Sequence, residues 1–186
     1  MSEIFGRMGG PRDDAEVGED QDARVDLSPR GARWIRRHLA GGVVAVTTSI
    51  EGRYRAATVS ACIVTSLEPL LFLVSVEVES QMEGWIRETG SFGLSILPWT
   101  EQFLADRFAG LAPLASPTLS EIAHFAAITG APLLRHSIGW ADCEVVSVLE
   151  TGDHTCFVGQ AVTIGHGDQD HADPLVYYLN RYRRFH

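Results

Sequence analysis

Four short segments of this sequence combine residue types that suit the binding of a flat, polar ligand. The first, residues 55–61 (RAATVSA), joins small side chains to hydroxyl groups. Small side chains let a planar ring approach the backbone, and Thr58, Ser60 and the backbone N–H groups can bond its polar edge. The same composition also suits a strand edge that packs on a neighbour, so this segment alone leaves both interpretations open.

The second segment offers a binding position for a phosphate, and the third contains a histidine. Ser80 and Gln81 open a predicted helix, and the free N–H groups and partial positive charge of a helix N-terminus suit a phosphate. An ordinary N-cap explains the serine equally well. Gly152 and Asp153 suit a tight turn, which leaves His154 at the start of a strand, either with a function or as a solvated turn residue.

The fourth segment lies at the C-terminal end, where aromatic and guanidinium groups alternate through Tyr177, Tyr178 and residues 181–184. These planes can stack on a ring, or they can cover one end of the domain. Spacing alone supports no Ser/His/Asp triad. The remaining six histidines form no HExxH or HxH pattern, so we expect no catalytic metal.

The charge distribution excludes several classes of function. The formal net charge is -9. Residues 1–26 contribute eight acidic side chains and three arginines to it. An acidic chain is a poor nonspecific nucleic-acid binder, since such binding needs cations to neutralise phosphates. The sequence contains no lysine, which excludes lysine Schiff-base chemistry and a phosphate-loop lysine.

Length and patterning indicate one small domain behind a tail. Residues 1–25 carry few large apolar groups and are predicted to form a disordered acidic tail, which leaves residues 26–186 as the domain. The three cysteines form no CxxC or zinc-type spacing and are expected to be reduced and buried. No signal peptide and no apolar run of about 18 residues is present, so we expect a cytoplasmic protein that does not enter the membrane.

The predicted elements are strands linked by short turns, with a few helices. Ser28 and Pro29 start a helix that Gly41 and Gly42 end. Residues 110–138 are predicted to be irregular, with one helical turn near 121–127, and no βαβ alternation or GxGxxG motif is present. This pattern predicts a mainly β fold, an antiparallel and nearly closed barrel with peripheral helices. The strands are expected at 43–50, 53–61, 70–76, 92–97, 141–150 and 155–165, and the further helices at 81–88 and 101–109.

Taken in order, the motifs of this chain resemble the short-chain flavin reductase family, the split-barrel reductase components of two-component monooxygenases. The resemblance spans about residues 30–185. One motif in isolation is weak, but five in the same order are specific. They are GVVAVTT (42–48), ATVSA (57–61) leading to SLEP (66–69), GSFGLSIL (90–97), TGAPLL (129–134), and GDH (152–154) followed by FVG (157–159).

The resemblance implies a homodimeric FMN-binding split barrel that reduces a flavin with NADH or NADPH, by hydride transfer to flavin N5. FMN is the expected flavin and FAD is possible; the reduced flavin would supply a separate oxygenase. By resemblance, His154 orients the nicotinamide, Ser80 and Gln81 lie near the phosphate, and Tyr182 belongs to a segment that covers the ring. The remaining flavin contacts that the resemblance implies are Ala57, Thr58, Val59, Ser60, Ala61 and Ser75.

The sequence departs from the family at several of these positions. Cys62, Ile63 and Val64 stand where many relatives have polar residues, and residues 77–79 (EVE) precede Ser80 where a basic residue is frequent. A flavin carrier or sensor without turnover therefore remains an alternative. So does an oxidase or oxygenase that acts on its own organic substrate.

Overall fold

The computed structural model describes residues 27–111, 119 and 121–184. The predicted acidic tail, residues 1–25, lies outside these ranges. The chain divides into a unit that ends at Arg36 and a unit from Arg37 to His186. In the first unit, α1 (Pro29–Arg36) begins after Ser28, as predicted, and the Ser28 hydroxyl accepts a hydrogen bond from Gly31 N.

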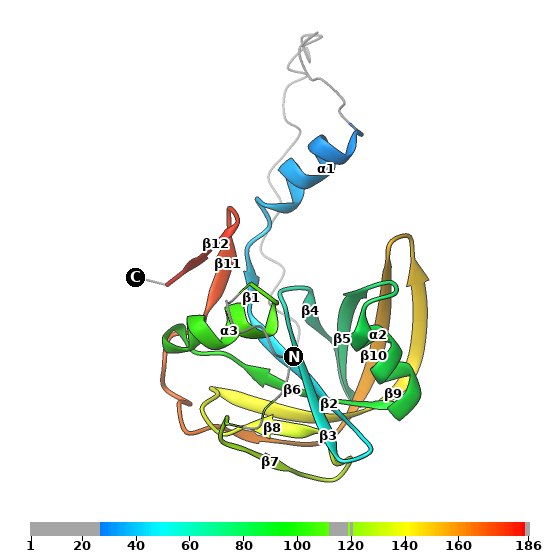
Figure 1. Ribbon diagram of the computed structural model, residues 1–186, viewed down its shortest axis with the longest axis vertical. Helices are drawn as coiled ribbons and strands as arrows, with labels where there is room; N and C mark the ends of the chain where they lie inside the picture. The colour runs from blue at the N-terminus through cyan, green and yellow to red at the C-terminus, as the bar shows by residue number, and fades with distance from the viewer. Residues whose placement is uncertain (1–26, 112–118, 120, 185–186) are drawn as a thin grey trace, which may run out of the picture. The chain divides into compact units, whose positions relative to one another are not determined.

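The second unit is built on one antiparallel sheet of seven strands, in the order β3-β2-β6-β9-β10-β5-β4 (Figure 1). This arrangement confirms the predicted mainly β, split-barrel fold. The strands are β2 (Val44–Ile50), β3 (Arg53–Val59), β4 (Cys62–Leu67), β5 (Leu70–Glu77), β6 (Ser91–Ile96), β9 (Gly139–Thr151) and β10 (His154–His166).

Local sequence explains the turns between these strands. Glu51 and Gly52 both adopt positive φ, at 49° and 73°, which is the type I′ geometry that a two-residue hairpin requires. Gly152 and Asp153 form the two-residue turn between β9 and β10, with His154 paired to Thr151 across it. Both hairpins agree with the predicted turns.

The core lies on both faces of β2, because successive side chains of a strand point to opposite faces. Val44 and Val46 belong to a cluster that includes Ile86 of α2 (Gln81–Thr89), whereas Ala45 belongs to a cluster with Phe108. Phe108 ends α3 (Gln102–Phe108), which follows a 3-10 turn, η1 (Trp99–Glu101). The two helices therefore anchor opposite faces of the same strand.

Two small sheets complete the fold. The first contains β1 (Gly41–Gly42), β11 (Val176–Tyr178) and β12 (Arg181–Arg183), and the second pairs β7 (His124–Ala126) with β8 (Pro132–Leu134). In the described part of the chain, no helix is long and apolar enough to cross a membrane.

Several expectations about individual elements were wrong. The helical turn near 121–127 is replaced by β7, whose backbone pairs with β8. The first helix ends at Arg36, and Gly41 and Gly42 pair with β11 instead of ending it. Strands β4, β11 and β12 were not predicted, because their residues carry no clear alternation of apolar and polar side chains.

The apolar run at residues 70–76 is only partly buried. Val74 and Val76 are buried, but Leu70 and Phe72 are half-exposed and line an apolar groove of about 690 Å³. The groove therefore continues from the core-facing side of this sheet, because Phe72 also packs against the cluster that contains Val74.

Candidate active site

The predicted ligand segment, residues 57–61, lies at the split of the barrel. Strands β3 and β4 are the two edges of the main sheet, yet they follow each other in the chain and are joined by Ser60 and Ala61. Among the described strands, no pairing connects β3 to β4. Edge strands carry unpaired backbone N–H and C=O groups, so this seam offers the polar backbone that a flat ligand needs.

The small residues of the seam keep it open. Ser60 and Ala61 are exposed, while Ala57, Thr58 and Val59 are half-buried. Ala57 and Val59 pack towards the cluster that contains α2. The hydroxyl of Thr58 donates to the carbonyl oxygen of Ala105 at 2.9 Å. The Thr58 hydroxyl proton is therefore engaged within the fold, and this hydroxyl can only accept a hydrogen bond from a ligand.

A glycine that sequence reasoning treated as a helix terminator supports the seam. A Cβ placed on Gly41 would lie 2.7 Å from the carbonyl oxygen of Ser60. Because real Cβ atoms do not approach backbone oxygen so closely, Gly41 lets β1 pass directly against Ser60. The sequence shows the pair of glycines, but the role of Gly41 depends on its contact with Ser60, which only the fold reveals.

Ser75, Ser80 and Gln81 follow the seam along β5 and into α2. Ser75 N donates to Ala61 O at 2.9 Å, which links β5 directly to the seam. Ser80 is the N-cap of α2, and its hydroxyl accepts from Glu83 N at 3.2 Å. Gln81, the first residue of the helix, is exposed. The helix start was predicted correctly, and its serine is already engaged as a cap.

His154 lies beside the connection between β5 and α2. It pairs with Glu77 at the end of β5, and Val78 N donates to Asp153 O at 3.0 Å. The imidazole Nδ1 lies 2.8 Å from the Asp153 carboxylate. The hydrogen bond from His154, with the charge attraction between the two groups, lowers the pKa of Asp153.

Tyr182 lies on the other side of the seam, against α3. It is half-buried in the cluster that contains Phe108, and its ring centroid is 5.6 Å from that of Tyr177. Burial, followed by the neighbouring Asp106 carboxylate with which it hydrogen-bonds, raises the pKa of Tyr182 well above its usual range. The phenol is therefore a neutral group tied to α3.

The predicted residues thus form two groups around one segment. Ser75, Ser80, Gln81 and His154 follow β5 and the start of α2, whereas Tyr182 and the Thr58 hydroxyl are fastened to neighbouring residues of α3. Residues 57–61 run between the two groups.

Sequence reasoning missed one stacked pair beside the seam. The Arg55 guanidinium lies over the Trp85 ring, 5.1 Å from its centroid. Arg55 shares its face of β3 with Ala57, two residues on, and Trp85 packs with Ala57 against the same cluster. The sequence places the tryptophan in a predicted helix, and no local pattern shows that an arginine covers it.

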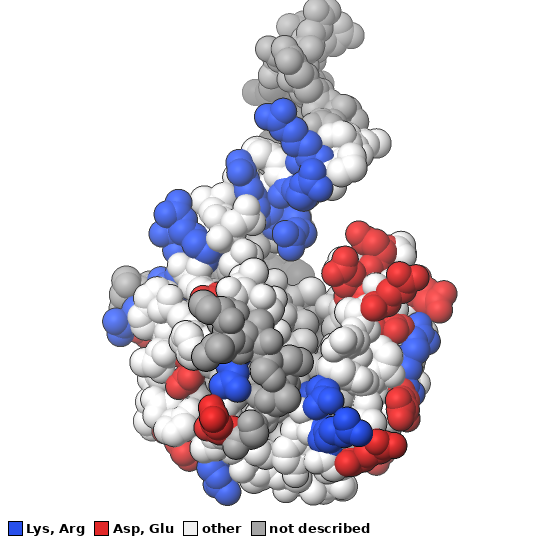
Figure 2. Space-filling view, in the orientation of Figure 1, with Lys and Arg blue, Asp and Glu red and all other residues white. Residues whose placement is uncertain are grey.

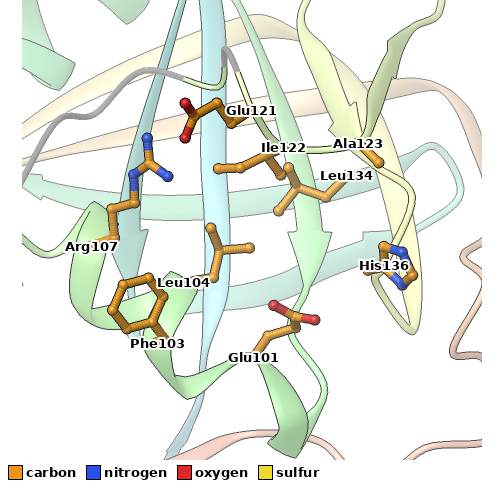
Figure 3. A pocket seen from close by; sticks show the side chains of 9 residues that line it. All are labelled: Glu101, Phe103, Leu104, Arg107, Glu121, Ile122, Ala123, Leu134 and His136. Carbon is orange, nitrogen blue, oxygen red and sulfur yellow. The ribbon is translucent and has the colours of Figure 1, made fainter.

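A separate pocket of about 360 Å³ lies between α3 and the β7–β8 region (Figure 3). Figure 3 shows Arg107 and Glu121 near one end of the pocket, with Glu101 and His136 towards the opposite side. None of the predicted site residues lines it. We therefore place the candidate active site at the seam.

Comparison with known proteins agrees with the fold described above. Residues 36–186 match the model of the flavin reductase like domain family. The chain belongs to this family. The match covers the whole of the second unit, and it confirms the resemblance and the predicted class of activity, NAD(P)H-dependent flavin reduction.

Individual relatives match over most of their length. The chain is 33% identical to an NADH-dependent flavin reductase of Rhodococcus sp, over 85% of this chain and 87% of the relative. It is 32% identical to the reductase component of a 4-nitrophenol 4-monooxygenase/4-nitrocatechol 2-monooxygenase of Rhodococcus opacus, over 80% and 76%. A solved structure, the flavin reductase component BorF of a bacterial two-component tryptophan halogenase, is 32% identical with a TM-score of 0.76, over 84% and 98%.

Proposed function

We propose that this chain binds a flavin along the seam at residues 57–61 and reduces it with NADH or NADPH presented from the His154 side. The observation that carries the proposal is the open seam between β3 and β4, which is linked through Ser75 and β5 to the turn that holds His154. Exposed small residues and free edge groups fit a flat heterocycle with a polar rim.

The protein contributes positioning in this reaction, since the cofactors carry the chemistry. The bound flavin supplies a hydride acceptor at N5 for the nicotinamide. Ser60 and Ala61, with Ala57 and Val59 behind them, hold the ring at the seam. His154 orients the nicotinamide, and holding two rings at contact distance is itself a large catalytic effect.

FMN is the flavin that we propose, with FAD as the alternative. A relative from Rhodococcus qingshengii, 31% identical over 81% of this chain, is named an NADH:FMN oxidoreductase. The relative from Rhodococcus opacus and the halogenase reductase are components of two-component systems. These names support a separate oxygenase as the consumer of the reduced flavin. A cytoplasmic location stays a prediction.

We also propose that the protein is a homodimer. Exposed apolar side chains of β4, β6 and β10 lie close together: Ile63 and Ile164 are each 58% exposed and Ile96 is 41% exposed. They belong to the groove of about 690 Å³ that also includes Val64 and Trp140. Monomeric proteins rarely expose a large contiguous apolar patch, and a second copy of the same face is self-complementary across a two-fold axis.

The decisive experiment mixes purified protein with FMN and NADH without oxygen and follows the absorbance of both cofactors. We expect one NADH to be consumed for each FMN reduced. Binding of FMN without NADH consumption would identify a carrier or sensor. NADH-independent oxidation of an added organic substrate would identify an oxidase.

A further inference from the structure

The structure surrounds the predicted phosphate seat with carboxylates. Glu77 is paired with His154, and Val78 N donates to Asp153 O, so the end of β5 and the β9–β10 turn lie side by side. Figure 2 shows acidic side chains gathered over this end of the sheet. We define the acidic rim as Glu77, Glu79, Glu83, Glu150 and Asp153.

The protein's own groups already compensate the free N–H donors and the partial positive charge at the start of α2. Ser80 accepts the hydrogen bond from Glu83 N, which is one of the free donors of the first turn. The Glu83 carboxylate then places a negative charge in that same turn, and it accepts a hydrogen bond from the Thr155 hydroxyl at 3.2 Å. A bound phosphate would compete with both groups for the positive end of the helix.

Two arginines near the start of α2, Arg87 of the helix itself and Arg55 of β3, already have partners. Arg87 pairs with Glu83 and, at 3.4 Å, with Glu150. Arg55 lies over the Trp85 ring, and its Nη1 donates to Tyr54 O at 3.1 Å. A phosphate at the start of α2 would therefore meet carboxylates, because the two arginines nearby already have partners.

From this arrangement we propose that the acidic rim prevents a firm grip on the flavin phosphate. The protein takes its flavin by the ring, and riboflavin is bound and reduced about as well as FMN. This inference rests on the proposed function and specifies the substrate class of that site. It depends on charge, because FMN carries about two negative charges on its phosphate at neutral pH and riboflavin carries none.

The test measures flavin affinity by quenching of flavin fluorescence, at low and high sodium chloride. Salt shortens the range of charge interactions, with a Debye length of about 30 Å at 0.01 M and 3 Å at 1 M. We expect the Kd of FMN to fall about two- to fivefold on going from low to high salt, while the Kd of riboflavin stays constant. At moderate salt the two Kd values should agree within about threefold.

A variant pair assigns the effect to the rim. Glu79→Gln should tighten FMN binding about twofold and leave riboflavin binding unchanged. Glu51→Gln is the matched control, since Glu51 is also an exposed glutamate with positive φ, and it lies in the β2–β3 turn, at the opposite end of β3 from the seam. It should change neither affinity.

Two results would overturn the inference and leave flavin reduction intact. One is a Kd or kcat/KM that favours FMN over riboflavin by more than tenfold. The other is FMN binding that weakens with salt, which requires a cationic phosphate seat. If the protein bound neither flavin, the proposed function would fail together with the inference.

Discussion

At the scale of single residues, the pair of His154 and Asp153 orients the imidazole. A carboxylate only accepts hydrogen bonds, so the 2.8 Å contact places a proton on His154 Nδ1. The other ring nitrogen, Nε2, is left to contact a ligand, on a side chain that is 43% exposed.

Replacing His154 by alanine should reduce the use of NADH without affecting flavin binding. The loss of one polar contact, worth roughly 0.5–1.5 kcal/mol, corresponds to about a two- to tenfold fall in kcat/KM for NADH. The flavin Kd should change little, because the proposed flavin contacts lie on the seam. Steady-state kinetics and fluorescence quenching measure the two effects.

His171→Ala is the control, because His171 forms a similar exposed pair with Asp170 outside the candidate site. It should leave both quantities unchanged. Unaltered NADH kinetics in the His154 variant would remove this residue from the nicotinamide site.

Two thiols make stability depend on pH in the alkaline range. Burial raises the pKa of Cys62 to about 11 and that of Cys143 to about 12, from 9.0. Because the unfolded thiols lose their protons first, the stabilisation is complete below about pH 9 and is lost as pH rises through the folded values. The free energy of unfolding should fall above pH 9 by at most about 1.4 kcal/mol per pH unit for each thiol.

Urea denaturation at several pH values measures this dependence. Cys62→Ala should make the decline between pH 9 and 11 shallower than in the parent protein. A parent protein whose stability is constant or rises over that range would contradict the assignment.

At the scale of elements, the seam depends on the strand that passes over it. Gly41→Ala would drive a Cβ into the carbonyl oxygen of Ser60, so the seam backbone must shift. We expect flavin affinity to fall at least about threefold, since the ligand lies on that backbone. Gly42→Ala is the matched control, because a Cβ on Gly42 meets nothing within 4 Å, and isothermal titration compares the two. Equal affinities would show that Ser60 does not contact the flavin.

A buried carboxylate holds the turn between β7 and β8. Asp142 on β9 accepts hydrogen bonds from Ile128 N at 2.7 Å, from Thr129 N at 2.8 Å and from the Thr129 hydroxyl. Asp142→Ala removes this buried, charged acceptor from three hydrogen bonds and should cost about 2–3 kcal/mol of unfolding free energy. Denaturation of this variant should be compared with Asp168→Ala, which removes an exposed carboxylate.

The sequence predicted the elements whose signals are local and missed those that depend on distant partners. The hairpin at Glu51 and Gly52 and the start of α2 at Ser80 carry turn and capping residues, and both were predicted correctly. By contrast, β7 exists because β8 and Asp142 hold it. No window of residues 121–127 contains that information.

The same distinction applies to the candidate site. Ser80 and His154 could be singled out from helix-start and turn chemistry. The stacking of Arg55 on Trp85, and the approach of Gly41 to Ser60, join residues of separate elements. Their roles follow from the closing of the barrel, which composition and spacing do not specify.

At the scale of the whole molecule, the apolar groove should keep two chains together. Ile63→Glu places a charge in the groove and should convert the proposed dimer into monomers, since burying an unpaired charge is costly. Light scattering measures the mass. Ile128→Glu alters a similarly exposed isoleucine outside the groove and should leave the dimer intact. A parent protein with the mass of one chain at micromolar concentration would refute the dimer.

The order of strands in the main sheet also determines when the site comes into existence during folding. The β2–β3, β4–β5 and β9–β10 hairpins join neighbours in the chain, whereas the β2–β6, β6–β9 and β5–β10 pairings join distant segments. Distant pairings form slowly, because long loops must close first. The seam lies between the β2–β3 and β4–β5 hairpins, and His154 belongs to a third hairpin, so no early hairpin alone contains a binding site. The ability to quench flavin fluorescence should therefore return with the slowest refolding phase, and bound flavin should slow the global unfolding of the domain instead of protecting one part of it.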